Sequence, residues 1–149
     1  MKLELGGGTV PTAGYTNLDP VHGEGDFRRR VQEGIPLPDC SVEAARCSHL
    51  MEHIPAGQER IAVFNDVWRV LVPRGTFEVV VPLFSSANPV GALADPTHVS
   101  LWIRESFAYF TGARRADADY GLRLWEMADW TTREWEWGTE GHALLRKPA

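Results

Sequence analysis

The chain has 149 residues, a length that fits one domain spanning residues 1–149, and its 20 acidic and 15 basic side chains give a net charge of −5. This negative balance provides no overall field that would attract a polyanion, so composition does not favour nucleic acid as a partner, although it does not exclude it. The two cysteines lack the spacing of a disulfide framework, and the sequence shows neither a signal peptide nor an apolar run of about 18 residues, so we expect a soluble, cytoplasmic protein.

The first predicted element is a short strand over residues 2–5, which ends at the three glycines of residues 6–8. Glycine allows positive φ and lets a ligand approach the backbone closely. A second predicted strand ends at Asp19. In a doubly wound sheet, a glycine turn after one strand and a carboxylate at the tip of its neighbour form the two ends of a nucleoside site. The carboxylate can accept hydrogen bonds from a ribose diol.

The spacing of the glycines indicates which nucleoside the site would bind. A dinucleotide fingerprint needs three glycines at fixed positions, and here Gly6 and Gly8 fit but Pro11 occupies the third. Only residues 6–14 separate the two strands, fewer than a helical crossover needs. A pyrophosphate would therefore lose the helix N-terminus that holds it. S-adenosylmethionine carries no phosphate, so it suits this turn better than NAD.

Residues 20–34 are polar and contain several glycines. We expect a short third strand over residues 28–32, with Phe27 and Val31 pointing inward. The adenine contact is placed on Val31 and Gln32, mainly through backbone and apolar packing. The three consecutive arginines of this segment are interpreted as a solvated edge.

The strand predicted at Val42–Ser48 is small and apolar enough to be covered on both faces, and it delivers Ser48 and His49 to the carboxyl edge of the sheet. A helix is predicted over residues 58–71 and a further strand over residues 76–81. The apolar stripe expected on that helix consists of Ile61, Phe64, Trp68 and Leu71.

The rest of the chain is predicted to close the sheet. Residues 83–96 form a loop rich in small side chains and long enough to be functional. Residues 104–110 form a short helix, with Phe107 and Phe110 packing inward. Residues 122–127 and 141–146 form two antiparallel strands joined by a long polar hairpin. The tryptophans of this region are interpreted as core and hairpin packing.

Five segments, taken in order, resemble class I S-adenosylmethionine-dependent methyltransferases, most closely the small type-11 group of bacteria and phages. They are Leu3-Glu4-Leu5-Gly6-Gly7-Gly8, Asn17-Leu18-Asp19, Ile35-Pro36-Leu37-Pro38-Asp39, Ser48-His49-Leu50-Met51-Glu52-His53 and Arg69-Val70-Leu71-Val72-Pro73-Arg74-Gly75. The likeness covers residues 2–82 and continues less specifically through residues 95–98. It implies an α/β fold, a Rossmann-like three-layer sandwich with a mostly parallel sheet of about seven strands and an antiparallel C-terminal hairpin.

The resemblance also implies S-adenosyl-L-methionine as cofactor. The residues it places at the cofactor are Leu5, Gly6, Gly7, Gly8, Asp19, Val31, Gln32, Ser48 and His49. Such enzymes generally carry helices before the first strand that cover the cofactor, whereas here Met1 directly precedes that strand. We therefore expect cover from a partner such as a second copy of the chain, or from later segments. The alternative is an open site in a catalytically inactive cofactor-binding module that works with a partner.

The candidate catalytic residues are His49 and His98. Methyl transfer from a sulfonium depends mainly on in-line positioning, and a general base matters only for an acceptor that arrives protonated. His49 follows a strand at the sheet edge, and Asp95-Pro96-Thr97 is a turn that could aim His98 over the same edge. The alternatives are a packing role for His49 and, around His98, a capping role for Asp95 and Thr97.

A competing interpretation is a zinc hydrolase, because His49-Leu50-Met51-Glu52-His53 matches the H-x-x-E-H motif. That motif needs a helix through both histidines, but Pro55 follows too soon and the preceding segment is predicted as strand. A third ligand could come only from a distant acid or from His98. We therefore expect no metal.

The acceptor is constrained by two missing motifs. DNA amino-methyltransferases share an Asp/Asn-Pro-Pro-Tyr/Phe motif, which the segment Ser48-His49-Leu50-Met51 does not match. Residues 38–40 do not supply the Pro-Cys nucleophile of cytosine-C5 enzymes. A small molecule, sugar or peptide is therefore favoured over a nucleic-acid base.

Overall fold

The computed structural model describes residues 1–85, 87–114 and 120–149. Ser86, inside the loop predicted over residues 83–96, lies outside the described residues. No helix in these described ranges is long and apolar enough to span a membrane. The elements are β1 (Lys2–Leu5), β2 (Thr16–Leu18), η1 (Gly25–Phe27), η2 (Val31–Glu33), β3 (Val42–Ser48), η3 (Met51–His53), α1 (Gln58–Val70), β4 (Leu71–Pro82), α2 (Val90–Leu93), η4 (Arg104–Ala108), β5 (Glu126–Trp135) and β6 (Gly138–Arg146), where η denotes a 3₁₀ turn.

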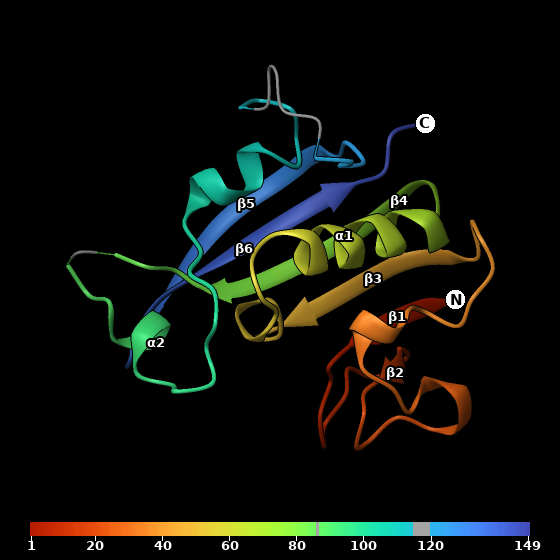
Figure 1. Ribbon diagram of the computed structural model, residues 1–149, viewed down its shortest axis with the longest axis horizontal. Helices are drawn as coiled ribbons and strands as arrows, with labels where there is room; N and C mark the ends of the chain where they lie inside the picture. The colour runs from red at the N-terminus through yellow and green to blue at the C-terminus, as the bar shows by residue number, and fades with distance from the viewer. Residues whose placement is uncertain (86, 115–119) are drawn as a thin grey trace.

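The strands form one sheet in the order β2-β1-β3-β4-β6-β5 (Figure 1). The pairs among β1, β2, β3 and β4 are parallel, and β6 pairs antiparallel with both β4 and β5. The predicted Rossmann-like α/β fold, mostly parallel with an antiparallel C-terminal hairpin, is therefore confirmed. The described sheet has six strands rather than about seven.

The strand predicted over residues 28–32 is wrong. The chain there forms η1 and η2, whose backbone groups bond locally: Arg28 N–H donates to the carbonyl of Gly25, and Gly34 N–H donates to that of Val31. Both glycines have positive φ, 52° and 91°, which favours tight turns over an extended ladder. As a result β2 pairs only with β1 and remains an edge strand.

The core lies between the sheet and α1, which crosses one face of β3 and β4 in Figure 1. Side chains in direct cross-strand register form two buried rows on this face. The first row is Leu3, Ala45, Phe77 and Leu145, and the second is Leu5, Cys47, Val79 and Ala143. The buried stripe of α1 is Val63, Phe64, Val67 and Val70. Ile61 and Trp68, expected in that stripe, are only half-buried because the stripe is centred on Val63 and Val67.

The opposite face of the sheet is charged. Glu4, Arg46 and Glu78 are cross-strand neighbours in register, and Arg46 pairs with both carboxylates at 3.3 and 3.2 Å. Glu4 also accepts hydrogen bonds from the backbone and the hydroxyl of Thr12. The loop around Thr12 therefore contacts this face of the sheet at Glu4.

The C-terminal hairpin has longer strands and a shorter connection than predicted. Only two residues separate β5 from β6, so the expected long polar hairpin is wrong. β5 is an edge strand with most side chains exposed, and it lacks the alternation by which a strand is recognised. In the predicted short helix over residues 104–110, Phe107 and Phe110 are buried, as expected.

Candidate functional site

The glycine turn follows β1 at the edge where the parallel strands end. Gly6 and Gly8 have positive φ, 68° and 58°. Gly6 N–H donates to the carbonyl of Leu18 at the end of β2, at 2.8 Å. No described atom lies within 4 Å of where a Cβ on Gly8 would stand, so the backbone there faces open space that a ligand can occupy.

Two side chains from the end of β2 hold the turn in place. Asn17 accepts a hydrogen bond from Gly7 N–H at 2.9 Å and donates to the carbonyl of Gly8 at 3.3 Å. Asp19 Oδ2 accepts from Gly8 N–H at 3.2 Å. The structure therefore brings the predicted glycines and the predicted carboxylate into direct contact.

Asp19 is 8% exposed and is held by backbone donors. Its Oδ1 accepts from the N–H groups of Val21 and His22, both at 2.8 Å. Burial raises the pKa of Asp19, but the hydrogen bonds from His22, Val21 and Gly8 outweigh it, and the pKa lies below its ordinary value. Since a carboxylate offers about four lone-pair sites, these contacts leave Oδ2 able to accept one further hydrogen bond, as from a hydroxyl.

The lowered pKa of Asp19 predicts how stability depends on pH. A carboxyl group whose pKa is lower in the folded state stabilises the fold above its unfolded pKa and loses that contribution as pH falls through the folded pKa. The advantage of wild type over Asp19→Asn in unfolding free energy should be constant from pH 7 to about 5 and decline below the ordinary value of 3.8. Urea unfolding of both proteins across this range measures it. A gap that closes well above pH 5 would show that another group titrates.

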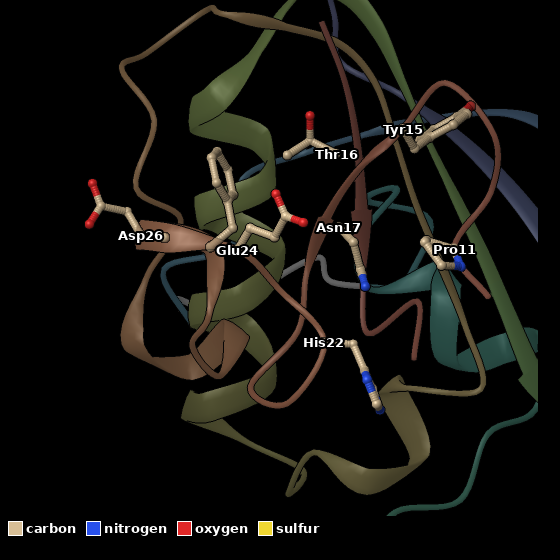
Figure 2. Close-up of a pocket in the computed structure, with 9 residues that line it drawn as sticks. Pro11, Tyr15, Thr16, Asn17, His22, Glu24 and Asp26 are labelled. Atoms are coloured by element: carbon tan, nitrogen blue, oxygen red, sulfur yellow. The ribbon is translucent and has the colours of Figure 1, made fainter. Parts of the chain in front are cut away.

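A cavity of about 740 Å³ lies beside the outer edge of β2. In Figure 2, Pro11 and Tyr15 lie on one side, Glu24 and Asp26 on the other, and Thr16 and Asn17 between them. The cavity borders the turn, since Asn17 contacts Gly7 and Gly8 directly.

The other predicted cofactor residues are less closely grouped. Leu5 is fully buried in the core at the end of β1, and Ser48 is half-buried at the end of β3. Val31 packs in the core, whereas Gln32 is exposed. A Cβ on Gly6 would lie 3.0 Å from the side chain of Leu50, so the segment after β3 adjoins the glycine turn.

His49 is fixed in an unusual backbone conformation. Its φ is 52°, and its N–H donates to the carbonyl of Val80 at 3.0 Å. Nδ1 lies 3.2 Å from Glu52 Oε1, and Nε2 lies 3.0 Å from Glu140 Oε2. Glu52 raises the pKa of His49, burial lowers it, and Glu140 adds to the rise, so that the pKa lies above its ordinary value. Both ring nitrogens thus face carboxylates.

His49 and His98 line the same cavity, of about 270 Å³, at the sheet edge. The structure therefore brings the two predicted catalytic histidines together. The cavity is also lined by Glu52, His53, Val90, Gly91, Ala94, Asp95, Trp135 and Trp137. His98 is held by Nδ1, which donates to the carbonyl of Ala92 at 3.0 Å.

Sequence reasoning missed two contributions to this site. Glu140, 8% exposed, reaches His49 from β6, and Trp135 packs its ring edge-on against His49 at 5.8 Å. Both come from the hairpin predicted as polar loop. No local pattern marks them, because only the antiparallel pairing of β6 with β4 brings Glu140 opposite Pro82.

The H-x-x-E-H motif lacks the helix that it requires. His49 is in the left-handed region, and only Met51–His53 forms a 3₁₀ turn. His49 and His53 therefore do not lie on consecutive turns of one helix. The capping alternative is met in part, because Asp95 Oδ1 accepts hydrogen bonds from the backbone and hydroxyl of Thr97, although no helix begins there.

No family model matches the chain, and no curated protein matches it in sequence. Solved structures do match. A Burkholderia thailandensis 1,6-didemethyltoxoflavin-N1-methyltransferase with bound 1,6-didemethyltoxoflavin and S-adenosylhomocysteine has a TM-score of 0.72 at 14% identity, covering 99% of this chain and 71% of that one. A SAM-dependent methyltransferase from Archaeoglobus fulgidus has a TM-score of 0.70 at 14% identity, covering 98% and 85%. The [4+2]-cyclase SpnF has a TM-score of 0.66 at 15% identity, covering 99% and 74%. The chain thus has the Rossmann-like fold of these proteins, two of which are methyltransferases.

Proposed function

We propose that this protein is an S-adenosylmethionine-dependent methyltransferase acting on a small-molecule, sugar or peptide acceptor. The observation that carries the proposal is the contact between the glycine turn and Asp19 at the same sheet edge as the cavity of His49 and His98. Methyltransferases with this fold support the reaction class. The cyclase with the same fold shows why the site, not the fold alone, must support the function.

The residues of the turn fit the cofactor. Gly8 leaves its backbone open to a ligand, and Asp19 keeps one acceptor position for a ribose hydroxyl. The proposed contacts from the ends of β1 and β3 are Gly6, Gly7, Ser48 and His49. Leu5, predicted with them, is fully buried and is proposed to support the glycine turn from the core. For the adenine, the proposal rests on the exposed Gln32 and the backbone of Val31, since the Val31 side chain is in the core.

The cofactor, when bound, supplies an electrophilic methyl group on a sulfonium. The contribution of the protein is to position the acceptor in line with that methyl group. His49 is held between Glu52 and Glu140, so neither of its nitrogens is free to take a proton from an acceptor. We propose that His49 shapes the cavity and that Nε2 of His98 faces an acceptor that arrives protonated.

Isothermal titration of the purified chain with S-adenosylmethionine and S-adenosylhomocysteine tests the cofactor assignment, with NADH as control. Micromolar binding of both sulfur ligands without NADH binding is expected. Absence of binding, or preference for NADH, would refute the assignment. Binding without turnover on small-molecule, sugar and peptide panels would favour the inactive module that works with a partner.

A further inference from the structure

We propose that Glu52, His53 and His98 form a binding site for a divalent transition-metal ion of the Zn²⁺ class in the cavity beside His49. One potential ligand atom from each of the three residues lies within 4.8 Å of the others. The set differs from the H-x-x-E-H motif because it omits His49 and includes His98, which lies 45 residues after His53. Metal binding itself does not depend on the proposed function, whereas its role toward an acceptor does.

Glu52 supplies the strongest argument for a cation. It is 1% exposed, and neither carboxylate oxygen has a hydrogen-bond partner. His49 Nδ1 lies 3.2 Å from Oε1 and His98 Nε2 lies 3.9 Å from it, so two imidazole nitrogens face Oε1 while Oε2 has no hydrogen-bond partner. Burying an ionised carboxylate without hydrogen bonds is costly. A metal ion bound to the Glu52 carboxylate would remove that cost.

Other buried carboxylates of the chain are satisfied, which sets Glu52 apart. Asp19 accepts hydrogen bonds from three backbone N–H groups. Glu4 accepts from Thr12 and pairs with Arg46. Glu140 is bonded by His49 and His142. Within the part of the chain that the structure describes, Glu52 is the buried carboxylate in which neither oxygen accepts a hydrogen bond.

Each of the two histidines is held through its Nδ1 atom. Nδ1 of His98 lies 3.0 Å from the carbonyl oxygen of Ala92, and Nδ1 of His53 lies 3.3 Å from that of Thr97. A carbonyl oxygen only accepts, so Nδ1 of His98 donates to Ala92, and Nδ1 of His53 is engaged by the carbonyl and the hydroxyl of Thr97, which leaves Nε2 of each ring as the nitrogen available to a metal. Metal-bound histidines characteristically donate their other ring N–H to a carbonyl or carboxylate in this way.

Backbone hydrogen bonds place the two histidines beside each other. The N–H groups of Val99 and Ser100 both donate to the carbonyl of Glu52, at 2.9 and 3.1 Å, and the Ser100 hydroxyl donates to that of Met51. The rings of His53 and His98 then lie 4.8 Å apart between centroids. Zinc–ligand distances of about 2.0–2.1 Å require only a small convergence of side chains from this arrangement.

The donor set defines the metal class. Two imidazoles and one carboxylate suit Zn²⁺, Co²⁺ or Fe²⁺, whereas Mg²⁺ and Ca²⁺ prefer oxygen ligands alone. Three protein ligands leave a coordination position open to the cavity. If the proposed function holds, an acceptor hydroxyl or amine bound there would lose its proton to solvent more readily under the metal's Lewis acidity. His98 would then act on the acceptor through the metal.

The test is titration of the metal-depleted chain with Zn²⁺ by calorimetry and with Co²⁺ by visible absorption. Wild type is expected to bind one equivalent of each metal, with the visible d–d bands of protein-bound Co²⁺. His53→Ala, His98→Ala and Glu52→Gln should each weaken binding at least about tenfold. The matched control His22→Ala removes an exposed histidine that does not line the cavity of His49 and His98, and it should bind Zn²⁺ like wild type. Loss of binding in His22→Ala, or its retention in His53→Ala and His98→Ala, would overturn the proposal.

Glu52→Gln adds a readout that a structural role would not give. Because Gln keeps the size of the Glu52 side chain but removes the charge that would bind the metal, the variant should lose the rise in Tm that Zn²⁺ produces in wild type. A lower Tm without metal, together with an unchanged response to Zn²⁺, would assign Glu52 a structural role only. Titration of the same metal-depleted protein with S-adenosylhomocysteine shows separately whether the proposed function holds.

Discussion

Asp19→Asn is expected to weaken S-adenosylhomocysteine binding by roughly 10- to 150-fold, the equivalent of one hydrogen bond to a charged group at about 1.5–3 kcal/mol. The amide oxygen can still accept from Val21 and His22, so the local turn is retained. The amide nitrogen that replaces Oδ2 cannot accept from a ribose hydroxyl, nor from Gly8 N–H. Both the ligand contact and the anchor of the glycine turn are lost together.

Calorimetric titration of wild type, Asp19→Asn and Asp39→Asn measures this effect. Asp39 is a matched control because its carboxylate is 74% exposed and pairs with Arg69 on the surface, before β3 rather than after it. Asp39→Asn should keep the wild-type affinity. Equal affinity of all three proteins would remove Asp19 from the cofactor site, and with it the main support for the proposed function.

The sequence predicted well what is decided locally. The glycines after β1 break the strand because of their own backbone preferences, and Asp19 ends its neighbour, so both could be placed without knowing the rest of the chain. The same holds for Val42–Ser48, whose small apolar side chains indicated an interior strand and thereby placed His49 at the sheet edge.

The sequence misled where a pattern admitted two structures. Phe27 and Val31 are spaced as in a short strand, but Gly25 and Gly34 close the segment into 3₁₀ turns. Local hydrogen bonds within those turns replace the ladder that a strand would form with β2. Gly25 and Phe27 of the first of these turns line the cavity beside β2, so this wall of the cavity could not be predicted while the segment was expected to be extended.

The cavity at His49 could be predicted only in part, because it depends on contacts between distant segments. The histidines were recognisable, but Glu140 joins them through the pairing of β6 with β4. His98 meets His53 through hydrogen bonds from Val99 and Ser100 to the carbonyl of Glu52. Neither contact has a signature in the spacing of residues along the chain.

Phe64→Ala is expected to lower the unfolding free energy by about 3–5 kcal/mol, the range for truncating a buried phenylalanine. Phe64 is fully buried and stacks on Phe110 with ring centroids 3.9 Å apart. It also meets Phe77 of β4 edge-on at 5.6 Å and Trp102 at 6.2 Å, so it joins α1 to the sheet and to the segment after residue 100. The cavity left behind cannot collapse without moving these elements.

For a domain of this size the loss corresponds to a fall in Tm of about 6–20 °C, which thermal unfolding followed by circular dichroism measures. Phe84→Ala, at a phenylalanine 38% exposed, is the control and should change Tm little. Below its Tm, Phe64→Ala should still bind S-adenosylhomocysteine like wild type, because the ring neighbours of Phe64 lie in the core and not in the glycine turn. Asp19→Asn should show the reverse, a large loss of affinity with a much smaller loss of stability. If both variants lost affinity and stability in the same proportion, the glycine turn would not be a binding element separable from the core.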